Sequence, residues 1–344
     1  MVNRPCVKCG LPGTISHSQT ATVFYCSSCY GEGIRLNFRS VLSRTKIFRN
    51  GRNPDQKPIE VLIVVEWDAR AKVLSQLIHE VTTETNPKKH FKINPTVYIV
   101  DSNDSLKVKT PTDCPLKVDG VVHLSAGLDS IVETKNTNPM RPKIETYRRL
   151  LGASKSQSII SELKRLMFDL LLWKLAVNLN IDVVLTSESS NLIAQRTLDL
   201  MCFGRSQSVS ILCSTLDQRH ERIQIVRPLR NIADSEIEFL LFEPENQTPP
   251  KFSQTGDPTT QKFLSHAMKS GFPSTVSTVL SVVSKLDNWK SNQTANANDD
   301  LSLCSICLMQ SSDDRELCEL CDNLLQQVSS SDERSFVHSA LRYR

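Results

Sequence analysis

This 344-residue sequence has no run of apolar residues long enough to cross a bilayer. Its most apolar stretch, residues 166–177, is interrupted by Asp169 and Lys174. The residues that follow Met1 also lack the apolar region of a secretory signal. These absences argue against a membrane span and against an oxidising compartment, so we expect a cytoplasmic protein whose thiols stay reduced.

The sequence also has no large net charge, because its 41 basic residues are nearly balanced by 37 acidic ones. The basic residues are nevertheless unevenly placed, with seven of them against a single acid between positions 35 and 58. Such a segment is typical of a surface that binds a phosphate backbone, and equally of a solvated helix face. The candidate RNA-binding residues in it are Arg39, Arg44, Lys46 and Arg49.

Eight of the eleven cysteines form four Cys-x-x-Cys pairs, which lie only near the two ends of the chain. Two thiolates separated by two residues can face one tetrahedral ion, and a second pair completes a four-sulfur site. The N-terminal pairs are 16 residues apart, as in zinc ribbons, and the C-terminal pairs are 10 apart, which makes a tighter loop. The sequence therefore predicts two structural zinc sites, with the ligands Cys6, Cys9, Cys26 and Cys29 in one and Cys304, Cys307, Cys318 and Cys321 in the other.

Disulfides and redox chemistry are the alternatives for these pairs. A redox Cys-x-x-Cys normally occurs once, near a strand–helix junction, rather than four times. Disulfides need the oxidising compartment that the missing signal region argues against. The seven histidines show no ligand spacing among themselves, and although His17 lies between the N-terminal pairs, four cysteines already fill that site.

The middle of the chain alternates between strand-like and helix-like segments. Residues 59–67 form a continuous apolar run, which is typical of a strand covered on both faces. Further strands are expected at 96–101, 120–124, 181–187, near 208–212 and near 222–226, and helices at 34–48, 69–83, 156–180, 189–203, 234–242, near 259–270 and near 274–290. This alternation predicts an α/β fold with a doubly wound parallel sheet.

Five segments follow from these patterns. An N-terminal zinc ribbon (1–33) leads into a basic amphipathic helix and linker (34–57), and then into the α/β domain (58–245). A helical extension with a low-complexity linker (246–300) separates this domain from the C-terminal zinc ribbon (301–325).

In an open parallel sheet, ligands bind beyond the carboxyl ends of the strands, often on a glycine-rich turn. The turn after the first strand here has no glycine, and Glu66 and Asp68 lie where an anion would sit. We therefore expect no ATP at this turn. Residues 125–130 (SAGLDS) look like a second phosphate loop, but they follow a later strand, and Pro139 and Pro142 cut short the helix that they would open.

Several stretches carry a resemblance to a known family: CVKCG, FYCSSCY, FRSVLSRTKIF, LTSESSNLIAQRTLDLMCFGRS, IVRPLRN, GFPSTVSTVLSVVSKL and LCSICLM. They span most of the chain, and GFPSTVSTV followed by the terminal cysteine pairs is the most specific of them. With these motifs the sequence resembles the cytoplasmic tRNA 2-thiolation protein 2 family. The resemblance implies an α/β domain of the ATP-pyrophosphatase type (adenine nucleotide alpha hydrolase-like), flanked by zinc ribbons.

The resemblance also implies a function. It points to a cytoplasmic heterodimer with the catalytic tRNA thiolase subunit. That complex makes 5-methoxycarbonylmethyl-2-thiouridine at the wobble position of lysine, glutamine and glutamate tRNAs. The sulfur comes from a thiocarboxylated ubiquitin-related modifier, so this carrier and tRNA are further expected partners.

The sequence departs from active thiolases at two places. Residues 66–71 replace their Ser-Gly-Gly-x-x-Ser phosphate loop, and their internal Cys-x-x-Cys is absent, because Cys114, Cys202 and Cys213 are all single. We therefore expect a pseudoenzyme that supports the catalytic subunit, has no catalytic residues of its own and binds no ATP. The alternatives are an active ATP-dependent tRNA sulfurtransferase with a variant phosphate loop at 125–130, and a zinc-ribbon scaffold without RNA contact.

Overall fold

A computed structural model describes most of the chain. Arg49 and the last two residues of the 125–130 segment lie outside the described part. No helix within the described part is both long and apolar enough to span a membrane. The described residues are 4–17, 20–48, 57–86, 90–102, 110–128, 141–242, 250–253, 256–293, 302–311, 315–328 and 330–343.

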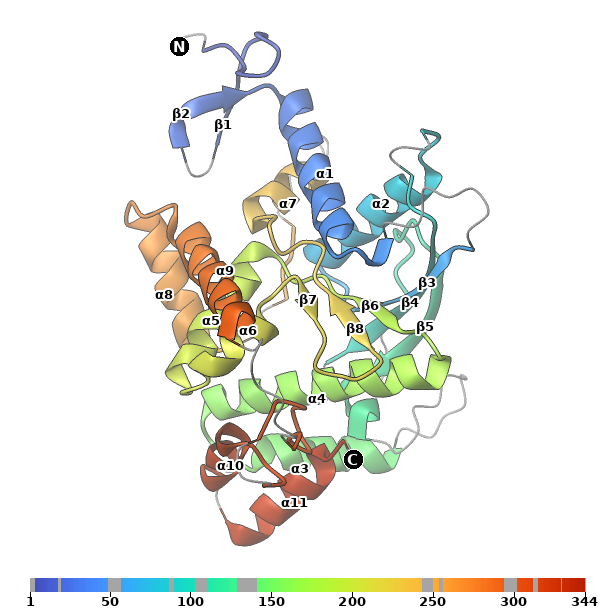
Figure 1. Ribbon diagram of the computed structural model, residues 1–344, viewed down its shortest axis with the longest axis vertical. Coiled ribbons are helices and arrows are strands. Elements are labelled where there is room, and N and C mark those ends of the chain that lie inside the picture. Colours follow the sequence, from blue (N-terminus) through green and yellow to red (C-terminus); the bar gives the residue numbers. More distant parts are fainter. Residues whose placement is uncertain are drawn as a thin grey trace.

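A six-stranded sheet forms the centre of the fold (Figure 1). Its strands are β3 (Ile59–Val65), β4 (Ile93–Asp101), β5 (Val118–His123), β6 (Val183–Leu185), β7 (Leu216–Asp217) and β8 (Gln224–Val226). The order β5-β4-β3-β6-β8-β7 places β3 inside the sheet, with β4 and β5 added on one side and β6 and β8 on the other. Neighbours are parallel except for β7, which runs antiparallel to β8 at one edge. The predicted doubly wound α/β fold is confirmed.

Both faces of the sheet are covered, as the apolar run of the first strand predicts. Along β3, Leu62 and Val64 face one hydrophobic cluster while Ile63 and Val65 face the other. The first cluster contains α3 (Arg141–Gly152), α4 (Gln157–Leu179) and the C-terminal helices α10 (Glu319–Gln326) and α11 (Ser331–Leu341). The second contains α1 (Ser27–Arg44), α2 (Ala69–Thr83) and α7 (Asp234–Leu241).

A third cluster lies beside the sheet and joins α5 (Ser190–Cys202), α6 (Val209–Leu212), α8 (Pro258–Lys269) and α9 (Thr275–Gln293). The predicted helices near 259–270 and 274–290 are confirmed. The strand predicted near 208–212 is wrong, because this segment is a single helical turn. Val209, Leu212 and Cys213, spaced as on one helix face, are all buried in the third cluster, and this packing outweighs the local preference of Val and Ile for strands.

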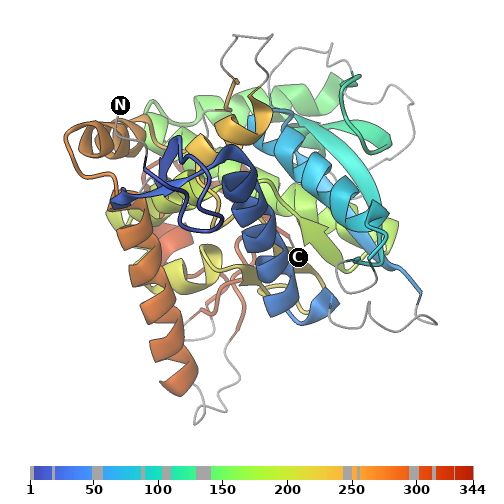
Figure 2. The ribbon, with the colours of Figure 1, turned by 90° about the horizontal axis from the view of Figure 1, so that it is seen from above.

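The segment before α1 and the C-terminal helices α10 and α11 lie toward opposite ends of the molecule's long axis (Figure 1). At the N-terminus, the hairpin of β1 (Ile15–His17) and β2 (Thr20–Tyr25) leads into α1, which lies between α2 and α9 in the view from above (Figure 2). The predicted apolar stripe of this helix, which includes Ile34 and Phe38, is buried. The helix begins at Ser27, earlier than predicted, because its first turn belongs to the second cysteine pair.

Candidate metal centres and central cleft

The N-terminal cysteine centre brings together the sulfur atoms of Cys6, Cys9, Cys26 and Cys29, all within 4.8 Å of one another. The first pair lies on a tight turn, closed by hydrogen bonds from the Cys6 N–H to the Leu11 carbonyl (2.7 Å) and from the Gly10 N–H to the Cys6 carbonyl (2.9 Å). Gly10 has a φ of 74°, a conformation that glycine adopts without strain. In the second pair, Cys26 caps the N-terminus of α1 and its sulfur accepts the Cys29 N–H.

The C-terminal centre repeats this construction with Cys304, Cys307, Cys318 and Cys321, again within 4.8 Å. The Cys304 N–H donates to the Met309 carbonyl (2.8 Å) and the Leu308 N–H to the Cys304 carbonyl (3.0 Å). Leu308, with a φ of 56°, takes the place that Gly10 has in the first centre. The second pair again lies at the start of a helix, α10. The two cysteine centres therefore have the same local construction, a tight turn that holds one pair and a helix N-terminus that holds the other.

The geometry of both centres fits a metal ion. A tetrahedral ion with metal–sulfur bonds of about 2.3 Å holds its sulfurs about 3.8 Å apart. The Cys9 and Cys26 sulfurs are 3.6 Å apart, and so are those of Cys307 and Cys318. Within the described residues, no further group of three or more histidines, cysteines or carboxylates could hold a metal.

The two centres differ in burial. Cys9 is exposed and only Cys6 is buried in the N-terminal centre, whereas all four cysteines of the C-terminal centre are buried. The C-terminal centre lies in the same hydrophobic cluster as α4. The first centre is therefore a surface module, and the second is part of the domain core.

A cleft of about 490 Å³ opens at the carboxyl ends of β3, β6 and β8. It lies where the strand order reverses between β3 and β6, the place at which doubly wound folds bind ligands. Residues from α4, including Ile160 and Phe168, and from α5, including Leu192, form its walls. The fold thus keeps a ligand-sized space at the expected position.

The turn between β3 and α2 fills the anion position of this cleft with the chain's own carboxylate. One oxygen of Asp68 accepts the backbone N–H groups of Arg70 (2.9 Å) and Ala71 (3.0 Å), which are the first free donors of α2. The other oxygen accepts from the Arg70 guanidinium (3.0 Å) and from the Ser253 N–H (2.9 Å). Arg70 also forms an ion pair with Asp234 at 2.8 Å. A phosphate at this helix terminus would have to displace a buried, fully paired carboxylate.

Glu66, the other acid of this turn, faces the cleft. Burial raises its pKa above the ordinary value, although hydrogen bonds from Ser102 and Ser253 oppose the shift. The nearby negative charge of Asp68 adds to the rise. The cleft therefore disfavours a further negative charge at this point.

The second loop considered from the sequence, 125–130, begins as a short 3₁₀ helix, Leu124–Leu128. Ser125 is buried, and its hydroxyl lies 2.7 Å from Nδ1 of His123. Gly127 lies against the backbone of α4, where an added Cβ would be 2.8 Å from the Met167 carbonyl oxygen. The glycine in this loop therefore serves helix packing, and the serine is already hydrogen-bonded within the protein.

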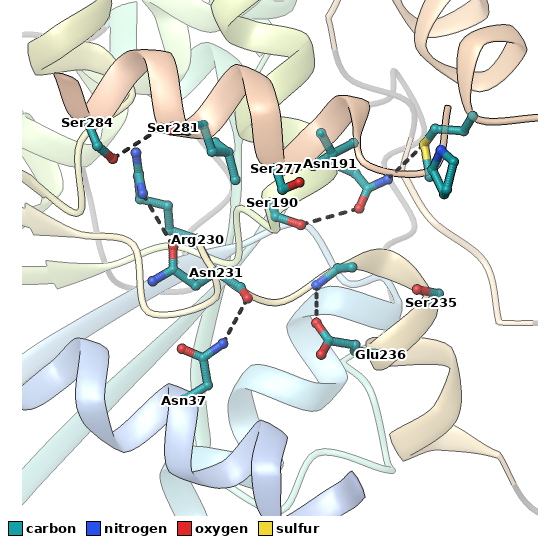
Figure 3. A pocket seen from close by; sticks show the side chains of 15 residues that line it. Asn37, Ser190, Asn191, Arg230, Asn231, Ser235, Glu236, Ser277, Ser281 and Ser284 are labelled. Atoms are coloured by element: carbon teal, nitrogen blue, oxygen red, sulfur yellow. Dashed lines mark hydrogen bonds between the residues drawn. The ribbon is translucent and has the colours of Figure 1, made fainter. Parts of the chain in front are cut away.

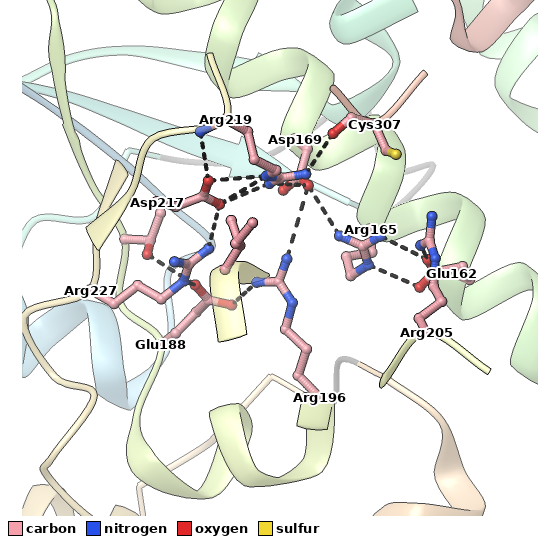
Figure 4. A network of polar contacts seen from close by, with 12 residues as sticks. Glu162, Arg165, Asp169, Glu188, Arg196, Arg205, Asp217, Arg219, Arg227 and Cys307 are labelled. Carbon is pink, nitrogen blue, oxygen red and sulfur yellow. Dashed lines mark hydrogen bonds and ion pairs between the residues drawn. The ribbon is translucent and has the colours of Figure 1, made fainter. Parts of the chain in front are cut away.

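A buried network of charged side chains, most of which line the cleft, links α4, α5, β7 and β8 to the C-terminal centre (Figure 4). Burial opposes ionisation of Glu162, but Arg165 and Arg205 outweigh it and hold the pKa of this carboxyl at about 2. Asp169 behaves in the same way beside Arg219 and Arg165, with a pKa of about 2. The members of this charged network are Glu162, Arg165, Asp169, Glu188, Arg196, Arg205, Asp217, Arg219 and Arg227.

Sequence reasoning did not find this network. Its members come from segments far apart in the chain, and no spacing rule connects them. One signal was present, since Asp169 interrupts the most apolar stretch of the sequence, and a charge at such a place requires a buried partner.

The candidate RNA-binding residues do not share one environment. Arg39 is 14% exposed and forms ion pairs with Glu84 (3.4 Å) and Glu32 (3.8 Å). Arg44 and Lys46, at the end of α1, are exposed and have no ion pair with another described residue. Arg44 and Lys46 are thus exposed side chains close in sequence, whereas the Arg39 charge is already balanced.

A second hollow, of about 390 Å³, lies between α1 and α9 (Figure 3). Asn37 of α1 donates to the Asn231 carbonyl on one side, and three serines one or two turns apart on α9 line the other: Ser277, Ser281 and Ser284. The groups are small and mostly uncharged, so this hollow offers hydrogen bonds and little electrostatic attraction.

The chain is similar to tRNA thiolases in fold. Its structure matches that of the U34-tRNA thiolase NcsA from Methanococcus maripaludis, solved with its 4Fe-4S cluster, with a TM-score of 0.53 over 96% of this chain and 99% of that one. At 15% identity this likeness concerns the fold alone. It confirms the predicted α/β fold with a doubly wound sheet.

The family is indicated by sequence. The family model described as cytoplasmic tRNA 2-thiolation protein 2 matches residues 259–342. Proteins of that name from Caenorhabditis elegans and Caenorhabditis briggsae are each 24% identical to the chain, over 92% and 95% of both partners respectively. The resemblance to the cytoplasmic tRNA 2-thiolation protein 2 family is thus confirmed.

Proposed function

We propose that this chain is the non-catalytic subunit of a cytoplasmic tRNA thiolase. It would act in a heterodimer with the catalytic subunit, in 2-thiolation of the wobble uridine of lysine, glutamine and glutamate tRNAs. The sulfur would come from a thiocarboxylated ubiquitin-related modifier. The similarity to the relatives over more than nine-tenths of the chain supports a role in tRNA 2-thiolation. The Asp68–Arg70 turn, which occupies the phosphate position, is the observation that supports a non-catalytic subunit.

The same turn and two further features of the chain support a pseudoenzyme. The phosphate position at α2 is filled by Asp68, and the alternative loop at 125–128 uses its serine and glycine for internal contacts. The internal cysteines Cys114, Cys202 and Cys213 are not part of a metal-ligating group among the described residues. A chain with neither group would lack the parts for adenylating uracil or for handling sulfur.

We propose zinc for both cysteine centres, because four thiolates around a tetrahedral point are the donor set of structural zinc sites. The residues that would hold it are Cys6, Cys9, Cys26 and Cys29 in one centre and Cys304, Cys307, Cys318 and Cys321 in the other. Neither site has a position left open for a substrate. Bound zinc would fix the fold of each end and supply no chemistry to a reaction.

We propose that the end of α1 contributes to tRNA binding through phosphates. Arg44 and Lys46 are exposed and close in sequence, and the candidate Arg49 follows them. Neutralising one cation that pairs with a phosphate should lower the salt slope of binding by about one unit, equally for all tRNAs. Arg44→Gln with Lys46→Gln tests this in the complex with the catalytic subunit, with Arg39→Gln as the matched control that should change the slope little.

The decisive experiment measures the two activities separately. ATP pyrophosphate release is assayed with this chain alone, and tRNA thiolation with the catalytic subunit in the presence and absence of this chain. We expect no pyrophosphate release by the chain alone and thiolation only with both chains. Pyrophosphate release that Ser125→Ala abolishes would instead establish the sulfurtransferase with a phosphate loop at 125–130.

A further inference from the structure

The burial of the C-terminal cysteine centre creates a charge problem that the N-terminal centre does not have. Four thiolates around a divalent ion carry two negative charges in excess. Cys304 and Cys321 are both 0% exposed, so water cannot screen this charge. A buried charge without a compensating partner is strongly destabilising. The N-terminal centre, with Cys9 exposed, is screened by solvent.

The compensating charge is in the neighbouring network. Arg205 is 3% exposed, and its Nη2 donates to the sulfur of Cys321 at 3.3 Å. Its Nη1 pairs with Glu162 of α4. Arg219 donates to the carbonyl oxygen of Cys307 at 3.0 Å (Figure 4).

The charge count of the network agrees with this placement. It contains five arginines and four carboxylates, which leaves one positive charge in excess inside the protein. The carboxylates pair mainly with the other arginines, and Arg205 is the member that contacts a thiolate. The network, with its excess positive charge, thus lies next to the metal centre, with its excess negative charge, and the two meet at the contact between Arg205 and Cys321.

We propose that Arg205 is a positioning residue that couples the C-terminal metal centre to the charged network that lines the cleft. Metal at this centre then stabilises the wall formed by α4, through Arg205 to Glu162 and through Arg219 to Asp169. The effect extends to α5 because Arg196 of α5 lies 3.9 Å from the same Asp169 carboxylate. Metal at the N-terminal centre holds the surface hairpin and the first turn of α1, which packs in the second hydrophobic cluster, away from α4 and α5. The two centres, alike in their ligands, would therefore have different effects on the α/β domain.

The first test uses the metal-loaded full chain and a chromophoric chelator in competition. Arg205→Met should weaken metal binding at one of the two sites on the order of ten- to a hundredfold, the usual effect of removing a partner of a metal ligand, and leave the other site unchanged. Arg205→Lys, which keeps the charge, should recover most of the affinity. Arg196→Met is the matched control, since this buried arginine pairs with Glu188 and, among the described residues, forms no hydrogen bond with a cysteine of the C-terminal centre. Wild-type affinity at both sites in Arg205→Met would overturn the proposal.

The second test needs no variant at the arginine and covers the case in which Arg205→Met fails to fold. Hydrogen exchange is followed in peptides of α4 and α5 while chelator removes first one ion and then both from the wild-type chain. Mass spectrometry of the intact protein, compared with the Cys6→Ser, Cys9→Ser double variant, assigns each step to a centre. Loss of the C-terminal ion should raise exchange in both helices at least tenfold, and loss of the N-terminal ion should leave them unchanged. Equal or absent responses would contradict the coupling.

Discussion

Replacement of Asp68 by alanine should destabilise the domain strongly, because this carboxylate completes the turn after β3. Asp68 is 7% exposed and accepts four hydrogen bonds, three of them from backbone N–H groups. Alanine leaves those three donors without an acceptor inside the protein. Arg70 keeps a partner, because its ion pair with Asp234 remains.

The magnitude follows from these contacts. A buried donor that loses its partner costs about 1–3 kcal/mol, and loss of a helix N-cap costs about 1 kcal/mol. With partial relaxation around the turn, the unfolding free energy should fall by about 4 kcal/mol, in the range for breaking a buried ion pair from one side. Asp68→Asn should cost about half as much, since its amide oxygen can still cap α2 while its NH₂ group faces the donors of Ser253 and Arg70.

The assay is urea unfolding of the metal-loaded chain, followed by circular dichroism and by tryptophan fluorescence. Asp182→Ala provides the control, because Asp182 forms an exposed ion pair with Arg222 and its loss should cost less than about 1 kcal/mol. A change below about 1 kcal/mol for Asp68→Ala would refute the reasoning, and so would equal losses for the alanine and asparagine variants. Either result would mean that the turn is not held closed by this carboxylate.

Three other outcomes are expected. The Cys6→Ser, Cys9→Ser variant and the Cys304→Ser, Cys307→Ser variant should each lose one of two metal ions by mass spectrometry, but only the second should lower the unfolding temperature of the α/β domain markedly. The unfolding free energy should fall as the pH drops from about 4.5 towards 2, because Glu162 takes up a proton in the unfolded chain but, with its folded pKa of about 2, stays ionised in the folded one. In urea titrations at each pH, the Glu162→Gln variant should show a smaller slope of unfolding free energy against pH, by about one proton. Gly127→Ala should cost about 1–3 kcal/mol, because its Cβ would lie 2.8 Å from a backbone oxygen of α4; unchanged stability would mean that the 3₁₀ helix and α4 can move apart.

The parts of the fold that could be predicted are those in which sequence neighbours are also spatial neighbours. Every residue from 61 to 65 is apolar, so the burial of this strand on two sides follows from the chain itself. The spacing of the cysteine pairs fixes the ligand sets in the same way. The segment 209–212 could not be decided locally, because its helix depends on contacts with α9.

The charged network was beyond local reasoning for a different reason. Arg205 and Cys321 are more than a hundred residues apart, and Arg219 reaches Asp169 from a separate element. Arginine and aspartate at isolated positions usually indicate a solvated surface. Only the tertiary structure shows that these side chains are buried and paired. For Arg39, the same lack of tertiary information hid its ion pair with Glu84.

The packing of the C-terminal residues on α4 has a consequence for how the chain folds during synthesis. Leu163, Leu170 and Trp173 of this helix share a cluster with Cys304 and Leu341, which are synthesised well after α4. At usual rates of synthesis, α4 waits on the order of 10 s before that cover exists. During this interval an apolar surface and several arginines lack their final partners. Newly made chains should therefore bind chaperones through α4, and premature termination before Cys304 should yield a product that is rapidly degraded.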